Sequence, residues 1–100
     1  MASVVSTVSA RIPPEREPEL IARFSAAVRA GMPERRRASL LRGDNHRWQI
    51  VTVWNSRGDL EQYLASTPEP FADELFRRAG ATPHVEIFEM VVDSDLPFWS

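Results

Sequence analysis

The segment 47–54 carries apolar side chains on both of its faces, and this pattern limits what the chain can fold into. It is rich in β-branched and aromatic residues, which favours a strand. Ile50 and Trp54 then point to one side of that strand, whereas Val51 and Val53 point to the other. A strand in a sheet with one solvated face alternates apolar and polar residues, so this strand is expected to be covered on both sides.

Two further segments are predicted to be strands. The segment 84–92 is apolar on both sides, with Val85, Ile87 and Val91 alternating with Phe88, Met90 and Val92. The segment 3–12 has an apolar face made of Val4, Val8, Ala10 and Ile12, and a more polar face made of Val5, Thr7, Ser9 and Arg11. A fourth strand, 36–42, is joined to 47–54 by the turn-forming residues 43–46.

Helices are predicted between these strands. The segment 15–30 has an amphipathic stripe made of Leu20, Ile21, Phe24, Ala27 and Val28. Ser56 is expected to cap a second helix, whose inner stripe is Leu60, Tyr63 and Leu64. Thr67 and Pro68 are expected to start another, with Phe71, Leu75, Phe76 and Ala79 on its buried side and Gly80 at its end.

The order of these elements predicts an α+β domain with a ferredoxin-like βαββαβ arrangement (a split βαβ). Its four-stranded antiparallel sheet would carry the helices on one face, leaving the other apolar face uncovered. A second copy of the same sheet is the simplest cover, so we expect a homodimer. The domain is expected to span residues 1–92, with a C-terminal tail at 93–100.

Composition excludes several classes of function. The net charge of −2 provides no field that would attract nucleic acid or an anionic membrane surface. The chain has no cysteine, hence no disulfide framework and no thiolate metal site. It also has no long apolar run and no N-terminal segment of the signal-peptide type. We therefore expect a cytoplasmic protein with no nucleic-acid or membrane partner.

The segment from Trp54 to Ser66, taken with this topology, resembles the antibiotic-biosynthesis monooxygenase family. Members of this family fold as dimeric α+β barrels and often begin the helix after the third strand with Trp-x-Ser. An apolar residue follows, and three positions later comes a His, a Trp or another aromatic residue. Leu60 and Tyr63 match these two positions. The resemblance covers residues 4–92.

The resemblance implies a pocket between the helices and the covered face of the sheet. Tyr63 is the predicted catalytic residue, since a phenol in an apolar cleft can hydrogen-bond a substrate oxygen or act as an acid. The predicted pocket residues are Val8, Trp48, Trp54, Leu60, Tyr63, Phe71 and Leu75. Each has a plainer interpretation as a core residue, because aromatic and aliphatic side chains are ordinary packing residues.

Haem-degrading members resemble this chain less than the other branches. The Asn of their first strand would fall near Val8 and their haem-ligating His near Leu75, and neither residue can take those roles. His46 and His84, the only two histidines, have no acidic cluster at metal-ligand spacing beside them. No metal, flavin or haem cofactor is therefore expected.

The resemblance implies oxidation of a small electron-rich aromatic, such as an anthrone, a quinol or a phenol, by O2. The alternative is a non-catalytic dimer of the same fold that binds a small ligand or another protein, because fold alone does not determine function. A pocket with no polar group other than Tyr63 would favour that alternative.

Overall fold

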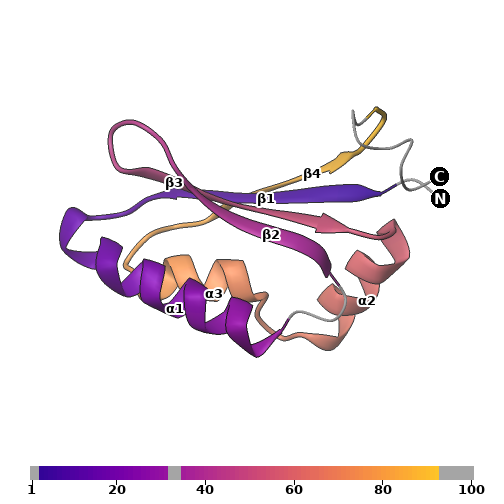
Figure 1. The fold of residues 1–100 in the computed structure, drawn as a ribbon, viewed down its shortest axis with the longest axis horizontal. Helices are drawn as coiled ribbons and strands as arrows, with labels where there is room; N and C mark the ends of the chain where they lie inside the picture. Colours follow the sequence, from indigo (N-terminus) through magenta and orange to yellow (C-terminus); the bar gives the residue numbers. More distant parts are fainter. Residues whose placement is uncertain (1–2, 32–34, 93–100) are drawn as a thin grey trace.

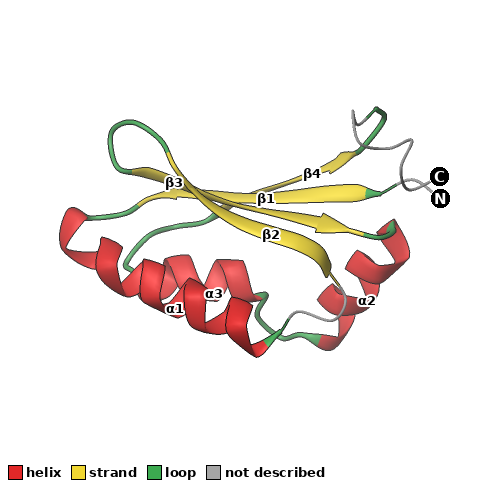
Figure 2. Cartoon of the chain, in the orientation of Figure 1, coloured by secondary structure: helices red, strands yellow, loops and turns green. Residues whose placement is uncertain are grey.

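A computed structural model describes residues 3–31 and 35–92 of the chain. Four antiparallel strands form one sheet in the order β2-β3-β1-β4, and the helices lie on one face of it (Figures 1 and 2). The elements are β1 (Val4–Arg11), a 3₁₀ turn (Pro14–Arg16), α1 (Glu17–Ala30), β2 (Arg35–Arg42), β3 (Arg47–Trp54), α2 (Arg57–Ser66), α3 (Phe71–Arg78) and β4 (His84–Glu89). The predicted ferredoxin-like α+β topology is confirmed.

The sheet-facing core follows the predicted alternation of side chains. On β1, Val4 and Val8 are buried under the helices, and Val8 lies opposite Ile50 of β3 and Val85 of β4. From α1, Leu20 and Phe24 pack into the same core, whereas Ile21 and Val28 remain 43% and 49% exposed. The stripe that α1 buries is thus narrower than the sequence pattern predicts. Ile21 and Val28 lie at the edge of this stripe, where the helix surface turns away from the sheet.

The helix predicted to start at Thr67–Pro68 begins later, at Phe71, and that prediction is wrong. The cause is a second proline. Pro70 disfavours helical geometry in the residue before it, so no helical turn can run from Pro68 through Glu69. Pro70 takes the N-cap position instead, and Thr67 is extended, with φ −119° and ψ 111°. Prolines therefore separate α2 from α3.

The last strand is shorter than predicted, because β4 ends at Glu89 and not at Val92. Glu89 lies opposite Val4, the first residue of β1, so the partner strand ends there. The Met90 N–H still donates to the Ser3 carbonyl (2.9 Å), but Val91 and Val92 are 78% and 84% exposed. The predicted tail, 93–100, lies outside the described residues.

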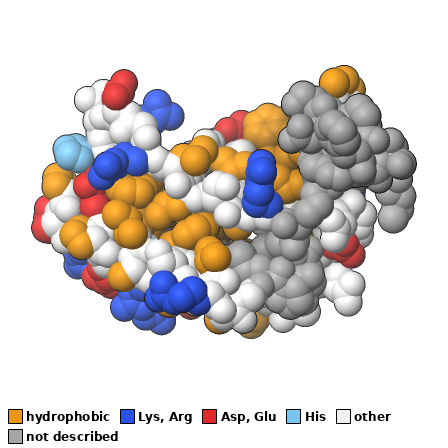
Figure 3. All heavy atoms as spheres, viewed as in Figure 1, with side chains coloured by type: hydrophobic (Ala, Val, Ile, Leu, Met, Phe, Trp, Pro, Cys, Tyr) orange, Lys and Arg blue, Asp and Glu red, His pale blue; other side chains and the backbone are white. Residues whose placement is uncertain are grey.

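The face of the sheet opposite the helices carries a mixture of apolar and polar side chains. Its apolar members come from all four strands and are Val5, Leu41, Val51, Val53 and Phe88. Leu41 and Phe88 are 46% and 50% exposed. In the view of Figure 3, other hydrophobic side chains gather between the sheet and the helices, and many charged ones lie along the outer side of the helices.

None of the helices in residues 3–31 and 35–92 has both the length and the apolar character needed to cross a membrane.

Candidate active site

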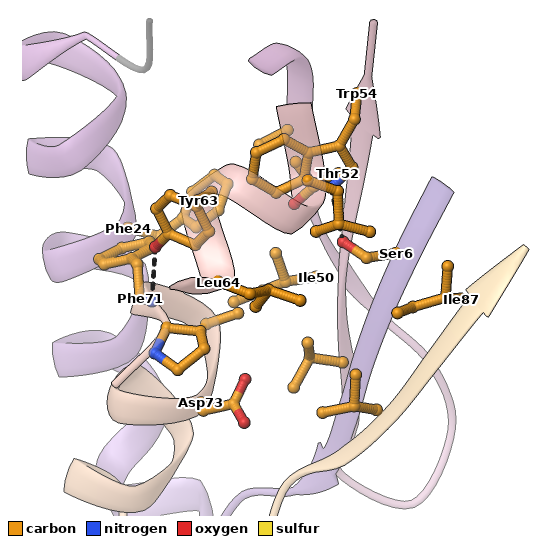
Figure 4. A pocket seen from close by; sticks show the side chains of 16 residues that line it. Ser6, Phe24, Ile50, Thr52, Trp54, Tyr63, Leu64, Phe71, Asp73 and Ile87 are labelled. Carbon is orange, nitrogen blue, oxygen red and sulfur yellow. Dashed lines mark hydrogen bonds between the residues drawn. The ribbon is translucent and has the colours of Figure 1, made fainter. Parts of the chain in front are cut away.

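A pocket of about 130 Å³ lies between the sheet and the second and third helices. Its walls come from all four strands and from α1, α2 and α3, and most of them are apolar. Leu64 of α2 and Val85 and Ile87 of β4, which line it, are 41%, 46% and 42% exposed. These three side chains are the most exposed of the residues that line the pocket, and two of them, Leu64 and Ile87, are labelled in Figure 4.

The pocket exists because one row of the sheet carries small side chains on three of its four strands. Ala38, Thr52 and Ser6 lie side by side on β2, β3 and β1, and all three line the pocket. The next row towards one end of β3 contains Trp54, and the next row towards the other end contains Ile50. Large side chains on both sides keep the helices away from the sheet, so the row of small residues leaves a gap between them.

Trp54 and Tyr63 form the aromatic end of the pocket. Their ring centroids are 5.1 Å apart with the rings tilted by 42°, a common geometry for aromatic pairs. Trp54 is 3% exposed, and its indole N–H donates to the hydroxyl of Ser6 (2.9 Å; Figure 4). The indole is therefore fixed in place by Ser6 and packs with Val4 and Leu60.

The hydroxyl oxygen of Tyr63 accepts a hydrogen bond from the backbone N–H of Phe71 (2.9 Å; Figure 4). Phe71 is the first residue of α3, and its N-cap, Pro70, makes no side-chain cap hydrogen bond. The tyrosine thus satisfies one of the backbone donors that a helix start leaves unpaired. It joins α2 to α3 across the pocket wall.

Asp73 contributes a carboxylate to this largely apolar wall. It lies in the first turn of α3, and Figure 4 shows its carboxylate directed into the pocket. Burial raises the pKa of Asp73 above its usual 3.8, although Arg77, one helical turn further on, opposes the shift. A carboxylate with a raised pKa in an apolar cleft is a candidate proton acceptor.

Five of the seven predicted pocket residues line the pocket: Val8, Trp54, Leu60, Tyr63 and Phe71. Trp48 and Leu75 do not. Both are buried in the main core, and the indole N–H of Trp48 donates to the Glu17 carboxylate (2.8 Å). Trp48 belongs to the row beyond Ile50, further along β3 from the row of small residues.

Neither histidine lies in the pocket. The His46 side chain is 57% exposed in the β2–β3 turn, 3.5 Å from the Glu17 carboxylate. The His84 side chain is 72% exposed at the start of β4. Among the described residues, no group of three or more His, Cys, Asp or Glu side chains could hold a metal ion.

Sequence reasoning missed the polar side of the pocket, namely Ser6, Thr52 and Asp73. A signal for the first two was present, because each is a small polar residue in an otherwise apolar inward-facing row of its strand. Asp73 gave no such signal, since an acidic residue in the first turn of a helix is common for electrostatic reasons alone.

Residues 3–85 match the sequence profile of the antibiotic biosynthesis monooxygenase family. The chain belongs to this family. No curated protein matches it in sequence.

Several solved structures have the same fold. The heme-degrader MhuD of Mycobacterium tuberculosis, with two hemes in its active site, is 28% identical, with 90% of this chain and 97% of that chain covered and a TM-score of 0.65. A point mutant of SnoaB of Streptomyces nogalater, a cofactor-independent oxygenase, is 23% identical over 92% and 96%, with a TM-score of 0.66. A protein of unknown function from Nitrosomonas europaea is 14% identical over 94% of each chain, with a TM-score of 0.70.

Proposed function

We propose that this protein oxidises a small electron-rich aromatic with O2, without a metal or flavin. The observation that carries the proposal is an apolar pocket with a carboxylate in its wall, in a chain of the monooxygenase family. Electron-rich phenols, such as quinols, pass an electron to O2 once they are deprotonated. The protein then needs only to bind the substrate, exclude water from it and assist the loss of its proton.

For a phenol, one substrate and one O2 give one quinone and one water. The phenolate transfers an electron to O2, and the resulting superoxide and ring radical join in a carbon–oxygen bond. The peroxide takes up a proton. Its O–O bond then breaks as the same ring carbon loses its hydrogen, so that water leaves and a carbonyl remains. The side chains of the pocket enter this sequence through proton transfer and orientation.

The size of the pocket favours single-ring substrates within the expected class. An apolar cavity of about 150 Å³ holds benzene, and this pocket encloses about 130 Å³. Pockets for larger ligands span about 300–1,000 Å³. A phenol or hydroquinone therefore fits better than a three-ring anthrone.

Haem fits this pocket poorly. Protein ligands to haem iron are His, Cys, Met or Tyr. The described lining residues include no His, Cys or Met, and the Tyr63 oxygen accepts the Phe71 N–H. The volume is also small for a macrocycle. We therefore propose no haem chemistry, and expect that haem titration gives no saturable Soret shift; tight one-to-one binding would contradict this.

The alternative of a non-catalytic binder is weakened by the polar groups beside Tyr63. Ser6, Thr52 and Asp73 all line the pocket, and a ligand site needing only shape would have little use for a carboxylate. We further propose a cytoplasmic homodimer that pairs through the face opposite the helices. The absence of cysteine suits a reducing compartment, and Val51 and Phe88 supply apolar surface on that face.

Oxygen consumption tests the proposal. Protein freed of metal with a chelator is mixed with phenol, hydroquinone or a model anthrone, and O2 uptake and quinone formation are followed. We expect enzyme-dependent uptake, fastest with a one-ring substrate. Wild-type protein that binds these compounds but consumes no O2 would support the binder instead.

A further inference from the structure

The two walls of the pocket differ in the polar groups that they offer. On the sheet side, Thr52 carries a hydroxyl, lines the pocket and is 7% exposed. Within the part of the chain that the structure describes, this hydroxyl has no hydrogen-bond partner. A buried polar group without a partner is costly, so its presence suggests that a ligand completes it.

On the helix side, Asp73 is the carboxylate of the pocket wall among the described residues. Figure 4 places it across the cavity from Thr52 and Ser6, with apolar side chains such as Leu64 and Ile50 between them. A ligand that satisfies both ends needs an apolar ring and two polar atoms on opposite sides of it. At the Asp73 end that atom must be a hydrogen-bond donor, because an ionised carboxylate only accepts.

We propose that the substrate is a one-ring aromatic with two oxygens on opposite sides, a hydroquinone or its mono-ether, bound between Thr52 and Asp73, and that Asp73 takes up its phenolic proton. This inference rests on the proposed oxygenation. In the step assigned to Asp73, the O–H bond of the phenol breaks and the proton moves to a carboxylate oxygen. The electron pair stays on the phenol oxygen, which becomes the electron donor to O2. In a hydroquinone the carbon opposite this oxygen carries no hydrogen, so the bond to O2 forms at a neighbouring ring carbon that does, and the products are a hydroxyquinone and water.

The charged surroundings of Asp73 suit this role. Arg77 on the same helix stabilises its ionised form, and Glu69, before α3, opposes that effect. The guanidinium of Arg77 also pairs with Glu69, so that its positive charge is shared between the carboxylates of Glu69 and Asp73. From α2 the ionisable group in the pocket wall is Tyr63; the described lining residues of α1 and of the four strands add none. The net effect of burial is a pKa above the usual 3.8, which makes the carboxylate a better base.

Binding under anaerobic conditions tests the inference apart from any turnover. The ligands are phenol and anisole, which differ by replacement of the O–H with O–CH3, and hydroquinone, which adds the second oxygen. Calorimetry on the wild-type protein should give phenol at least about a tenfold preference over anisole, because anisole leaves the carboxylate without a donor. Asp73→Asn should remove most of this preference, since the amide can donate to the ether oxygen.

A matched control is Glu74→Gln, which removes the same charge from the same turn of α3. The Glu74 side chain is 44% exposed, pairs with Arg78 and does not line the pocket. This variant should keep the phenol preference. Thr52→Val keeps the shape of the side chain and removes the hydroxyl. This variant should lower the preference for hydroquinone over phenol by several fold, and it should leave the preference for phenol over anisole unchanged.

Equal affinities for phenol and anisole in the wild type, or a preference that survives Asp73→Asn, would overturn the inference. Correct binding preferences without O2 uptake would leave it standing as a ligand-recognition site and sink the oxygenation instead. Where turnover is seen, kcat/KM of the wild type should fall at acidic pH as Asp73 becomes protonated. In Asp73→Asn that acidic limb should disappear, and the rate should rise only as the free phenol ionises.

Discussion

The hydroxyl of Tyr63 lies 2.9 Å from the backbone nitrogen of Phe71, whose N–H donates to it. The bond joins the middle of α2 to the first residue of α3. Because the N-cap of α3 is Pro70, whose side chain cannot accept a hydrogen bond, the tyrosine acts in place of a side-chain cap. The predicted catalytic residue thus has a structural task that also fixes the helix carrying Asp73.

Tyr63→Phe keeps the ring and removes the hydrogen bond to Phe71. We expect a loss of about 1 kcal/mol in the free energy of unfolding, the usual value for one such bond. Tyr63→Ala should cost about 3 kcal/mol or more, because it also opens a cavity beside Trp54. Urea denaturation measures both losses. A Tyr63→Phe variant as stable as the wild type would show that the bond to Phe71 contributes nothing.

The same variant also bears on the catalytic role predicted for Tyr63. If the hydroxyl acts in the transition state, Tyr63→Phe should lower kcat by about tenfold or more. Leu64→Met is a suitable control, because it changes a lining side chain on the same helix without removing a hydroxyl. A change in KM alone would assign the tyrosine to positioning.

Asp73→Asn should make the protein more stable at neutral pH. The folded-state pKa of Asp73 is raised, so its ionised form is less favourable in the folded protein than in the unfolded chain. The wild type should regain the stability that it lacks relative to the variant as the pH falls through the folded-state pKa of Asp73 towards 3.8, its usual value. Thermal midpoints across this range, with Glu74→Gln as the control, measure the effect. A midpoint lowered at neutral pH would contradict the assignment.

Glu17 should give the opposite pH dependence. Its pKa is lowered, first by the hydrogen bond from Trp48 and then by His46 and Arg42. The ionised form of Glu17 therefore stabilises the folded protein fully above pH 4.5, the usual pKa of the group. This stabilisation is lost as the pH falls through the lower pKa that Glu17 has in the folded protein. Glu17→Gln should remove this part of the acid dependence. Unfolding curves recorded at a series of pH values between neutral and acidic test this, and identical acid profiles for the two proteins would count against it.

The homodimer is expected to depend on the sheet face opposite the helices. Phe88 is half exposed in the single chain, so Phe88→Asp should leave the subunit folded. In a dimer the new charge would be buried without a partner, at a cost of several kcal/mol, about 3–5. Sedimentation at micromolar concentration should give a dimer for the wild type and a monomer for the variant. Ile21→Asp, at an exposed position on α1 on the other side of the sheet, is the control. A monomeric wild type would remove the basis for the expected barrel.

Periodicity was sufficient to predict the sheet and its faces, because alternation along a strand depends on local geometry alone. The simplest case is β1, where Val4 and Val8 are buried while Val5 and Thr7, which alternate with them, are only partly buried. The start of α3 could not be predicted in the same way, since Pro68 suits a first helical position and only Pro70 rules it out. The positions of Trp48 and Leu75 outside the pocket depend on how far the helices stand from each row of the sheet. A single strand pattern does not encode that distance.

The row formed by Ala38, Thr52 and Ser6 has a consequence for how such a chain can change over time. These three side chains lie on different strands, and none of them holds the fold together by its bulk. A single enlargement, such as Ala38→Leu, would shorten the space available to a ligand, and a reduction such as Thr52→Ala would lengthen it. The large residues of the neighbouring rows would keep the sheet and helices in place in either case. At Ala38 and Thr52, substrate range can thus change without disturbing the fold, whereas Ser6 also accepts the hydrogen bond from the buried Trp54 indole.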